Sequence, residues 1–211
     1  YNNEIHGLLL TFHSLVVSDI ERKKNDEDMK ETIVLLYNSC SCISNVVSIS
    51  IRNYGCGPIA DIGLRCMRSS VQSCIQNIKI MTSSSNNYYE SLLYDLILSS
   101  STLASLILSS SSRVGGEESR KTGCRLLTDI IMICEENNHE MNYNSLFNTI
   151  YNGLIQCLSK HWCPEVRASC IQGLIRFMKI SNKINSSHLY QLLVTSIKKE
   201  NHGPTYCLQL K

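Results

Sequence analysis

The chain has 211 residues, of which 43% are hydrophobic and 18% are charged, and its formal net charge is +2. This composition excludes an intrinsically disordered chain, and the small charge excludes a global electrostatic attraction to nucleic acid or to an anionic membrane. Any such contact must therefore come from a local patch of charge.

Long apolar blocks and few helix breakers predict helices throughout the first half of the chain. Only three prolines occur in the whole sequence, and the spacing of apolar residues suits helices better than strands. We expect helices over 3–22, 28–44, 59–81 and 88–109, joined by polar linkers. Residues 45–51 are ambiguous because they are rich in β-branched side chains. A lone strand would have nothing to pair with, so we expect this segment to be helical too.

One uncharged run raises the question of a membrane span. Residues 96–112 carry no charge, but serines interrupt the run, and Asp95 and Arg113 flank it. A membrane-spanning helix needs about twenty mostly apolar residues. We therefore expect a serine-rich buried helix and no membrane span.

The second half shows the clearest helical periodicity. From residue 141 onward, apolar side chains recur at every fourth position in two adjacent rows, which predicts a helix that packs on more than one neighbour. Pro164 stands at a favourable first helical position and is followed by Glu165. A last apolar block, 189–197, predicts an eighth helix.

Similarity between two segments of the chain predicts a repeat array. The segment around Arg120 resembles the segment around Arg167, and this separation of 47 residues falls within the period of HEAT and armadillo repeats. We therefore predict an all-α, HEAT- or armadillo-like α-solenoid of roughly four helix pairs, with Arg120 and Arg167 as struts that tie neighbouring repeats together. Terminal repeats need polar outer faces, and both ends of the chain look apolar. Residues 1–211 are therefore expected to form a single segment of a longer array.

The cysteines are predicted to be reduced and buried. Their number, eleven, is odd, and no C-x-x-C pair occurs. Cys157, His161 and Cys163 lie close in the sequence, but their spacing matches no established zinc pattern and no fourth ligand is evident. We expect no metal, no cofactor and a cytoplasmic location.

Several basic residues are candidate contacts for RNA or for a partner protein. Phosphate binding by a solenoid would use such side chains as positioning contacts without reading the bases. The alternative is that they belong to ordinary solvated helix faces. The candidates are Arg120, Lys121, Arg125, Arg176, Lys179 and Lys183.

The sequence contains no recognised catalytic motif. No G-x-S-x-G, Walker loop, H-E-x-x-H or G-x-G-x-x-G pattern appears. We therefore predict that the chain is not an enzyme.

Near its start the chain carries Asn3, Ile5, His6 and Gly7 in an Asn-x-Ile-His-Gly pattern, followed by an apolar helix. This pattern resembles a motif of the THADA family, which comprises very large cytosolic helical-repeat proteins, and the rest of the chain suits the C-terminal half of that family. The resemblance implies a non-catalytic accessory subunit. Its partner would be a tRNA ribose methyltransferase that 2′-O-methylates nucleotide 32 of the anticodon loop, with tRNA itself as a further contact.

Two interpretations of the motif stay open. His6 and Gly7 either contact RNA or the partner enzyme, or they start the helix and allow close helix packing. The rival for the whole chain is a HEAT or armadillo adaptor that binds only proteins.

Overall fold

The computed structural model describes residues 2–20, 25–54, 57–80, 86–110, 116–136, 144–160 and 163–180, with 190–191 and 194–195. Within these residues the protein is all-α and has no strand, as predicted. The helices are α1 (Asn2–Ile20), α2 (Asp26–Tyr54), α3 (Gly57–Ile80), α4 (Asn86–Ser109), α5 (Glu117–Glu136), α6 (Asn144–Lys160) and α7 (Pro164–Ile180). Most of the predicted eighth helix lies outside the described residues.

The ambiguous segment 45–51 is helical and lies inside the single long helix α2. Asn25 starts this helix, because its Oδ1 accepts a hydrogen bond of 2.8 Å from the backbone N–H of Asp28. Val47 and Ile51 are buried along the segment. Tertiary packing therefore decides the conformation here against the weak strand preference of β-branched residues.

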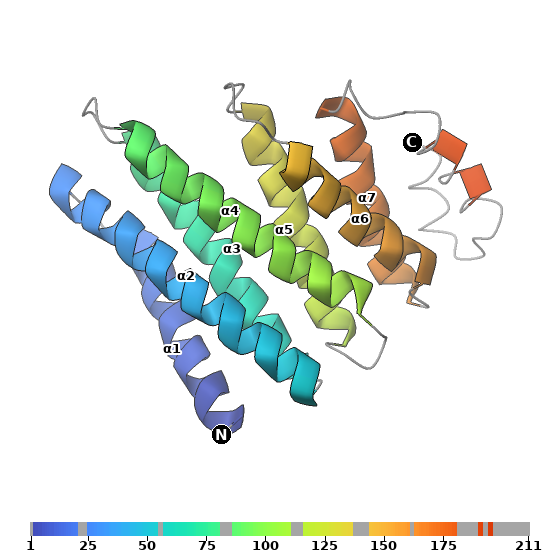
Figure 1. Ribbon diagram of the computed structural model, residues 1–211, viewed down its shortest axis with the longest axis horizontal. Helices are drawn as coiled ribbons and strands as arrows, with labels where there is room; N and C mark the ends of the chain where they lie inside the picture. The colour runs from blue at the N-terminus through green and yellow to red at the C-terminus, as the bar shows by residue number, and fades with distance from the viewer. Residues whose placement is uncertain are drawn as a thin grey trace.

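The helices form two layers. Helices α1, α3, α5 and α7 lie side by side in one layer, and α2, α4 and α6 lie side by side in the other (Figure 1). Across the layers, α3 packs on α2 and α4, α4 also packs on α5, and α6 packs on α7. The chain thus alternates between the two layers as it advances along the stack.

Glycines and small side chains allow close contacts between helices, both within one layer and across the two layers. At Gly153 of α6, an added Cβ would lie 3.0 Å from the Cα of Ser105 on α4. The Oγ of Ser105 also donates a hydrogen bond of 2.8 Å to the carbonyl of Thr149. At Gly63 of α3, an added Cβ would lie 2.5 Å from Val47 of α2. These contacts fix the spacing of α4 with α6 and of α2 with α3.

Neighbouring helices of the first layer are also joined by polar contacts. Arg68 of α3 forms an ion pair with Asp129 of α5. Ser119 of α5 donates a hydrogen bond of 3.1 Å to the carbonyl of Gly57 at the start of α3. These bonds join residues about sixty positions apart in the sequence, so they fix the register of α3 against α5.

Two helices are long and apolar enough to cross a membrane by length and composition alone, within Asp26–Asn53 and Asn87–Ser109. These segments coincide with α2 and α4. Both helices pack against neighbours within the stack, and core helices of a soluble protein meet the same criterion. The absence of a membrane span stays a prediction.

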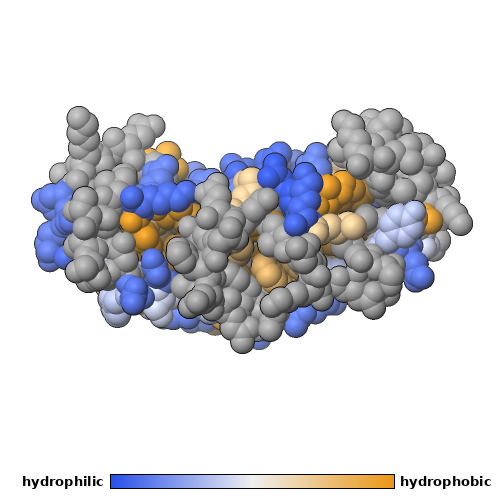
Figure 2. Space-filling model, turned by 90° about the horizontal axis from the view of Figure 1, so that it is seen from above, coloured by the Kyte–Doolittle hydropathy of each residue, from blue (hydrophilic) through white to orange (hydrophobic). Residues whose placement is uncertain are grey.

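The surface mixes hydrophobic and hydrophilic patches. Figure 2 shows apolar side chains exposed between polar ones on the side seen there. Large apolar residues are exposed on α1, where Leu8 is 72% and Leu15 62% exposed, and on α2, where Leu35 is 65% exposed. The described residues thus leave part of the first helix without apolar cover.

Candidate functional site

Arg120 is buried at the join between α4 and α5. Its side chain is 1% exposed, and its Nη1 donates hydrogen bonds to the carbonyls of Ile107 at 3.0 Å and Leu108 at 3.1 Å. Its Nη2 donates to the carbonyl of Ser110 at 3.3 Å. The last carbonyls of a helix have no partner within the helix, and they carry the negative end of its dipole. The guanidinium therefore caps the C-terminus of α4.

This burial corrects one sequence-based prediction. A side chain that is enclosed by protein cannot serve as a surface contact for RNA, so Arg120 is removed from that set of candidates. The contact that it makes with the end of the preceding helix is the kind that the strut prediction describes. Arg167, the other predicted strut, is half-buried on α7.

Lys121 is also engaged within the protein. Its Nζ lies 3.0 Å from Oε1 of Glu118, one turn earlier in α5. The hydrogen bond to Glu118 raises the pKa of Lys121. This lysine has an acidic partner already, which weakens its candidacy as a phosphate contact.

Three of the predicted contact residues are exposed and belong to neighbouring helices. Arg125 lies on α5, and Arg176 and Lys179 lie on α7. Among the described residues, none of the three forms an ion pair, whereas the Nε of Arg65 on α3 lies 2.9 Å from Oδ2 of Asp61 on the same helix. We call Arg125, Arg176 and Lys179 the α5–α7 basic patch. Lys183 lies outside the described residues.

The contact between α5 and α7 fixes the level of these residues along the two helices. The Sγ atoms of Cys124 and Cys170 are 3.4 Å apart, so Arg125 lies level with the residues that follow Cys170. Arg176 and Lys179 continue along α7 over the next turns. The three cations therefore lie on adjacent helices of the first layer, at successive levels along them.

A cluster of three thiols, which was not predicted from the sequence, lies in the core where α5, α6 and α7 meet. The Sγ atoms of Cys124, Cys157 and Cys170 all lie within 4.8 Å of one another, and all three residues are buried. Cys157 therefore belongs to this cluster, whereas the sequence placed it only beside His161 and Cys163, a set whose spacing matches no zinc site. His161 lies outside the described residues. The available signal was the separation of Cys124 from Cys170, which nearly equals the repeat spacing.

Cys163 has different surroundings from the thiols of the cluster. Its Sγ donates a hydrogen bond of 2.9 Å to Oε2 of Glu165. Burial and this bond raise the pKa of Cys163. Its thiol is therefore protonated and close to a carboxylate at the start of α7.

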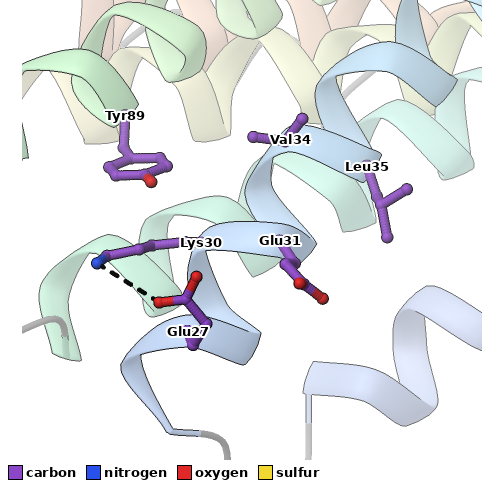
Figure 3. Close-up of a pocket in the computed structure, with 6 residues that line it drawn as sticks. All are labelled: Glu27, Lys30, Glu31, Val34, Leu35 and Tyr89. Carbon is purple, nitrogen blue, oxygen red and sulfur yellow. Dashed lines mark ion pairs between the residues drawn. The ribbon is translucent and has the colours of Figure 1, made fainter.

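Two shallow grooves open beside α2. The first lies between α1 and α2, has a volume of about 380 Å³ and is lined by Leu8, Leu9, Phe12, Asn38, Ser39, Cys42 and Ile43. The second lies between α2 and α4, and Figure 3 shows it with Tyr89 of α4 facing Lys30. There the Nζ of Lys30 pairs with Oε2 of Glu27 at 3.9 Å. The first groove is mainly apolar, whereas charged side chains of α2 line the second.

The Asn-x-Ile-His-Gly motif occupies the first two turns of α1. Asn3 and Gly7 are exposed, and Ile5 and His6 are half-buried. Ile5 packs against the core. A Cβ added at Gly7 would meet no described atom within 4 Å, so the close helix packing predicted for this glycine is not found among the described residues.

The open space at Gly7 gives a direct prediction. Gly7→Ala should raise the free energy of unfolding by about 0.5–1 kcal/mol, because alanine loses less backbone entropy in a helix. Urea denaturation followed by circular dichroism would measure the change. A loss of stability would show that Gly7 packs against something in the folded protein.

Comparison with known proteins gives no match. None of the protein-family models, curated proteins and solved structures is significantly similar to this chain. The resemblance to the THADA family therefore still depends on the residues of the motif alone.

Proposed function

We propose that the chain is a segment of a HEAT-like α-solenoid scaffold, of the THADA type, that assists 2′-O-methylation of the ribose of nucleotide 32 in tRNA. It acts in the cytoplasm as a non-catalytic accessory subunit, and the partner methyltransferase performs the methyl transfer. It holds tRNA against that partner.

The alternation of the helices between two layers supports the solenoid part of this proposal. In an α-solenoid each helix pair contacts mainly the pairs before and after it. The layer of α1, α3, α5 and α7 and the layer of α2, α4 and α6 have this nearest-neighbour arrangement. The exposed apolar side chains of α1, with Leu8 and Leu15 among them, suit the prediction that further helices continue the array.

The α5–α7 basic patch carries the RNA part of the proposal. Exposed arginine and lysine side chains that form no ion pair within the described part of the chain can bind phosphate at the lowest cost, since no ion pair has to be broken. The net charge of only +2 means that such a local patch, rather than the whole surface, would attract tRNA.

The test of this proposal combines deletion of the gene with reversal of the charges of the α5–α7 basic patch. Cells that lack the gene should lose 2′-O-methylation at nucleotide 32 of tRNA, as measured by site-specific RNA mass spectrometry. The wild-type protein should restore it, whereas R125E/R176E/K179E should not. The purified triple variant should bind tRNA at least about tenfold more weakly, and the salt dependence of binding should fall by roughly 2–3 in slope.

A charge-matched control separates the patch from general repulsion. The variant K30E/R52E/K79E makes the same change in net charge at basic residues of α2 and α3, and we expect it to keep most of the tRNA affinity. Intact methylation after deletion would refute the function as a whole. Restored methylation and normal tRNA binding by R125E/R176E/K179E would instead refute only the patch as the RNA surface.

A protein-only adaptor is the second candidate, and the groove between α1 and α2 favours it. Its lining is mostly apolar, and Leu8 is largely exposed at its edge. Exposed apolar patches rimmed by polar residues often mark protein-binding sites. If deletion leaves tRNA methylation unchanged, this becomes the leading function.

A further inference from the structure

The buried thiol cluster draws its three members from three different helices. Cys124 lies on α5, Cys157 on α6 and Cys170 on α7, and each side chain is at most 1% exposed. Their Sγ atoms are all within 4.8 Å of one another. Both layers of the stack thus contribute a sulfur atom to one point in the core.

The separations of the sulfur atoms suit a common ligand. A metal–thiolate bond measures about 2.3 Å, so three sulfurs arranged in a plane around one metal ion are about 4 Å from one another. The pair Cys124–Cys170 is closer, at 3.4 Å, and no pair exceeds 4.8 Å. Small side-chain rotations would therefore bring all three sulfurs to bonding distance from a central ion.

The donor set selects the kind of metal. Thiolates prefer soft cations such as Cu(I) over hard ones. Structural zinc sites have four protein ligands, and the described histidine, cysteine and acidic residues supply only these three at the cluster. Cu(I) is stable with two or three sulfur ligands, so an all-sulfur site of three favours it over zinc.

The surroundings also favour a cation with negatively charged ligands. Arg120 lies one helical turn before Cys124 on α5 and is buried as well. Each thiol that binds as a thiolate releases one proton to solvent. Two thiolates, one neutral thiol and Cu(I) give a net charge of −1, which the +1 charge of Arg120 offsets within the core.

Without a metal the cluster is chemically quiet. The pKa values of Cys124 and Cys170 are raised well above that of a free cysteine, mainly by hydrogen bonds to neighbouring thiols. The thiol that raises the pKa of Cys124 belongs to Cys157. Those that raise the pKa of Cys170 belong to Cys124 and Cys157. Thiols that stay protonated are poor nucleophiles.

We propose that Cys124, Cys157 and Cys170 bind one Cu(I) ion through their three sulfur atoms, joining α5, α6 and α7. The site is independent of tRNA binding. It departs from the sequence-based expectation that the chain binds no metal, because that expectation considered a different set of ligands.

The test is an anaerobic titration of the chain with Cu(I) against a chromogenic chelator that competes for the ion. The wild-type chain should retain one equivalent of Cu(I), and copper should raise its melting temperature. Each of C124S, C157S and C170S should weaken binding by more than about tenfold, since even the loss of supporting groups costs about 10- to 100-fold. X-ray absorption of the wild-type complex should show three sulfur neighbours.

Two matched controls distinguish this site from adventitious thiol binding. Cys134 is buried elsewhere on α5, and Cys42 is exposed on α2; C134S and C42S should both keep the copper. Circular dichroism would identify any variant that fails to fold, and the wild-type stoichiometry and absorption spectrum do not depend on such variants. Failure of the wild-type chain to compete for Cu(I), loss of copper in C42S, or a spectrum without three sulfurs would each overturn the proposal.

Discussion

Arg120→Met should lower the free energy of unfolding by about 3 kcal/mol. Methionine keeps much of the volume of the side chain but removes the donors that bond the carbonyls of Ile107, Leu108 and Ser110. A buried carbonyl left without a hydrogen bond costs about 1–3 kcal/mol, and hydrogen bonds from a charged donor are the stronger ones. Part of this loss is offset, because the variant no longer buries a charge.

Arg125→Met provides the matched control for this prediction. Arg125 is on the same helix but exposed, so its replacement should change stability by no more than about 0.5 kcal/mol. Chemical denaturation of both variants would give the two values. If both variants lost the same free energy of unfolding, the hydrogen bonds of Arg120 to the end of α4 would stabilise the fold no more than an exposed arginine does. Arg120→Lys should recover only part of the loss, since one ammonium cannot reach the carbonyls in the fork geometry of arginine.

Gly153→Ala should destabilise the protein by about 2 kcal/mol, although alanine is the better helix former. The new Cβ would lie 2.5 Å from Oγ and 3.0 Å from Cα of Ser105. The backbone of α4 cannot move aside as a flexible side chain can, so α4 and α6 would have to separate. Overpacking of this kind costs about 1–3 kcal/mol, and it outweighs a gain in helix propensity of up to about 1 kcal/mol.

Gly123→Ala is the corresponding control in α5. There an added Cβ would lie 3.5 Å from Leu108, at ordinary contact distance. We expect this variant to be as stable as the wild type or slightly more stable. In a double-variant cycle, S105G should relieve part of the cost of G153A, and the coupling between the two should exceed about 0.5 kcal/mol. If the stability changes of G153A and S105G were additive, the strain of Gly153→Ala would not arise from its contact with Ser105.

Much of the helical content followed from the sequence, because its signals are local. Pro164 starts α7 where its fixed backbone angle and missing N–H are tolerated. The predicted boundaries of α3 and α4 agree with the structure to within two residues at each end. The segment 45–51 was predicted correctly only because a strand had no partner.

The candidate sites were harder to predict, because they depend on contacts between distant helices. The sequence cannot show that Arg120 turns inward to the end of α4 while Arg125, one turn later, stays in solvent. It also cannot show that Cys157 meets Cys124 and Cys170 rather than Cys163, since that depends on how α6 crosses α5 and α7. In the sequence, Cys157 could be considered only with its near neighbours, whereas the packing of the layers brings it to cysteines on two other helices.

The layered arrangement also determines how mechanical strain passes through the molecule. The major contacts of α1 are with α3, which also contacts α5 within its layer, and α5 in turn contacts α7. A force applied to one end is therefore transmitted from each interface to the next, and each interface is displaced by a small amount. A partner that bends the α1 end would displace α7 through these interfaces and through those of α2, α4 and α6 beside them.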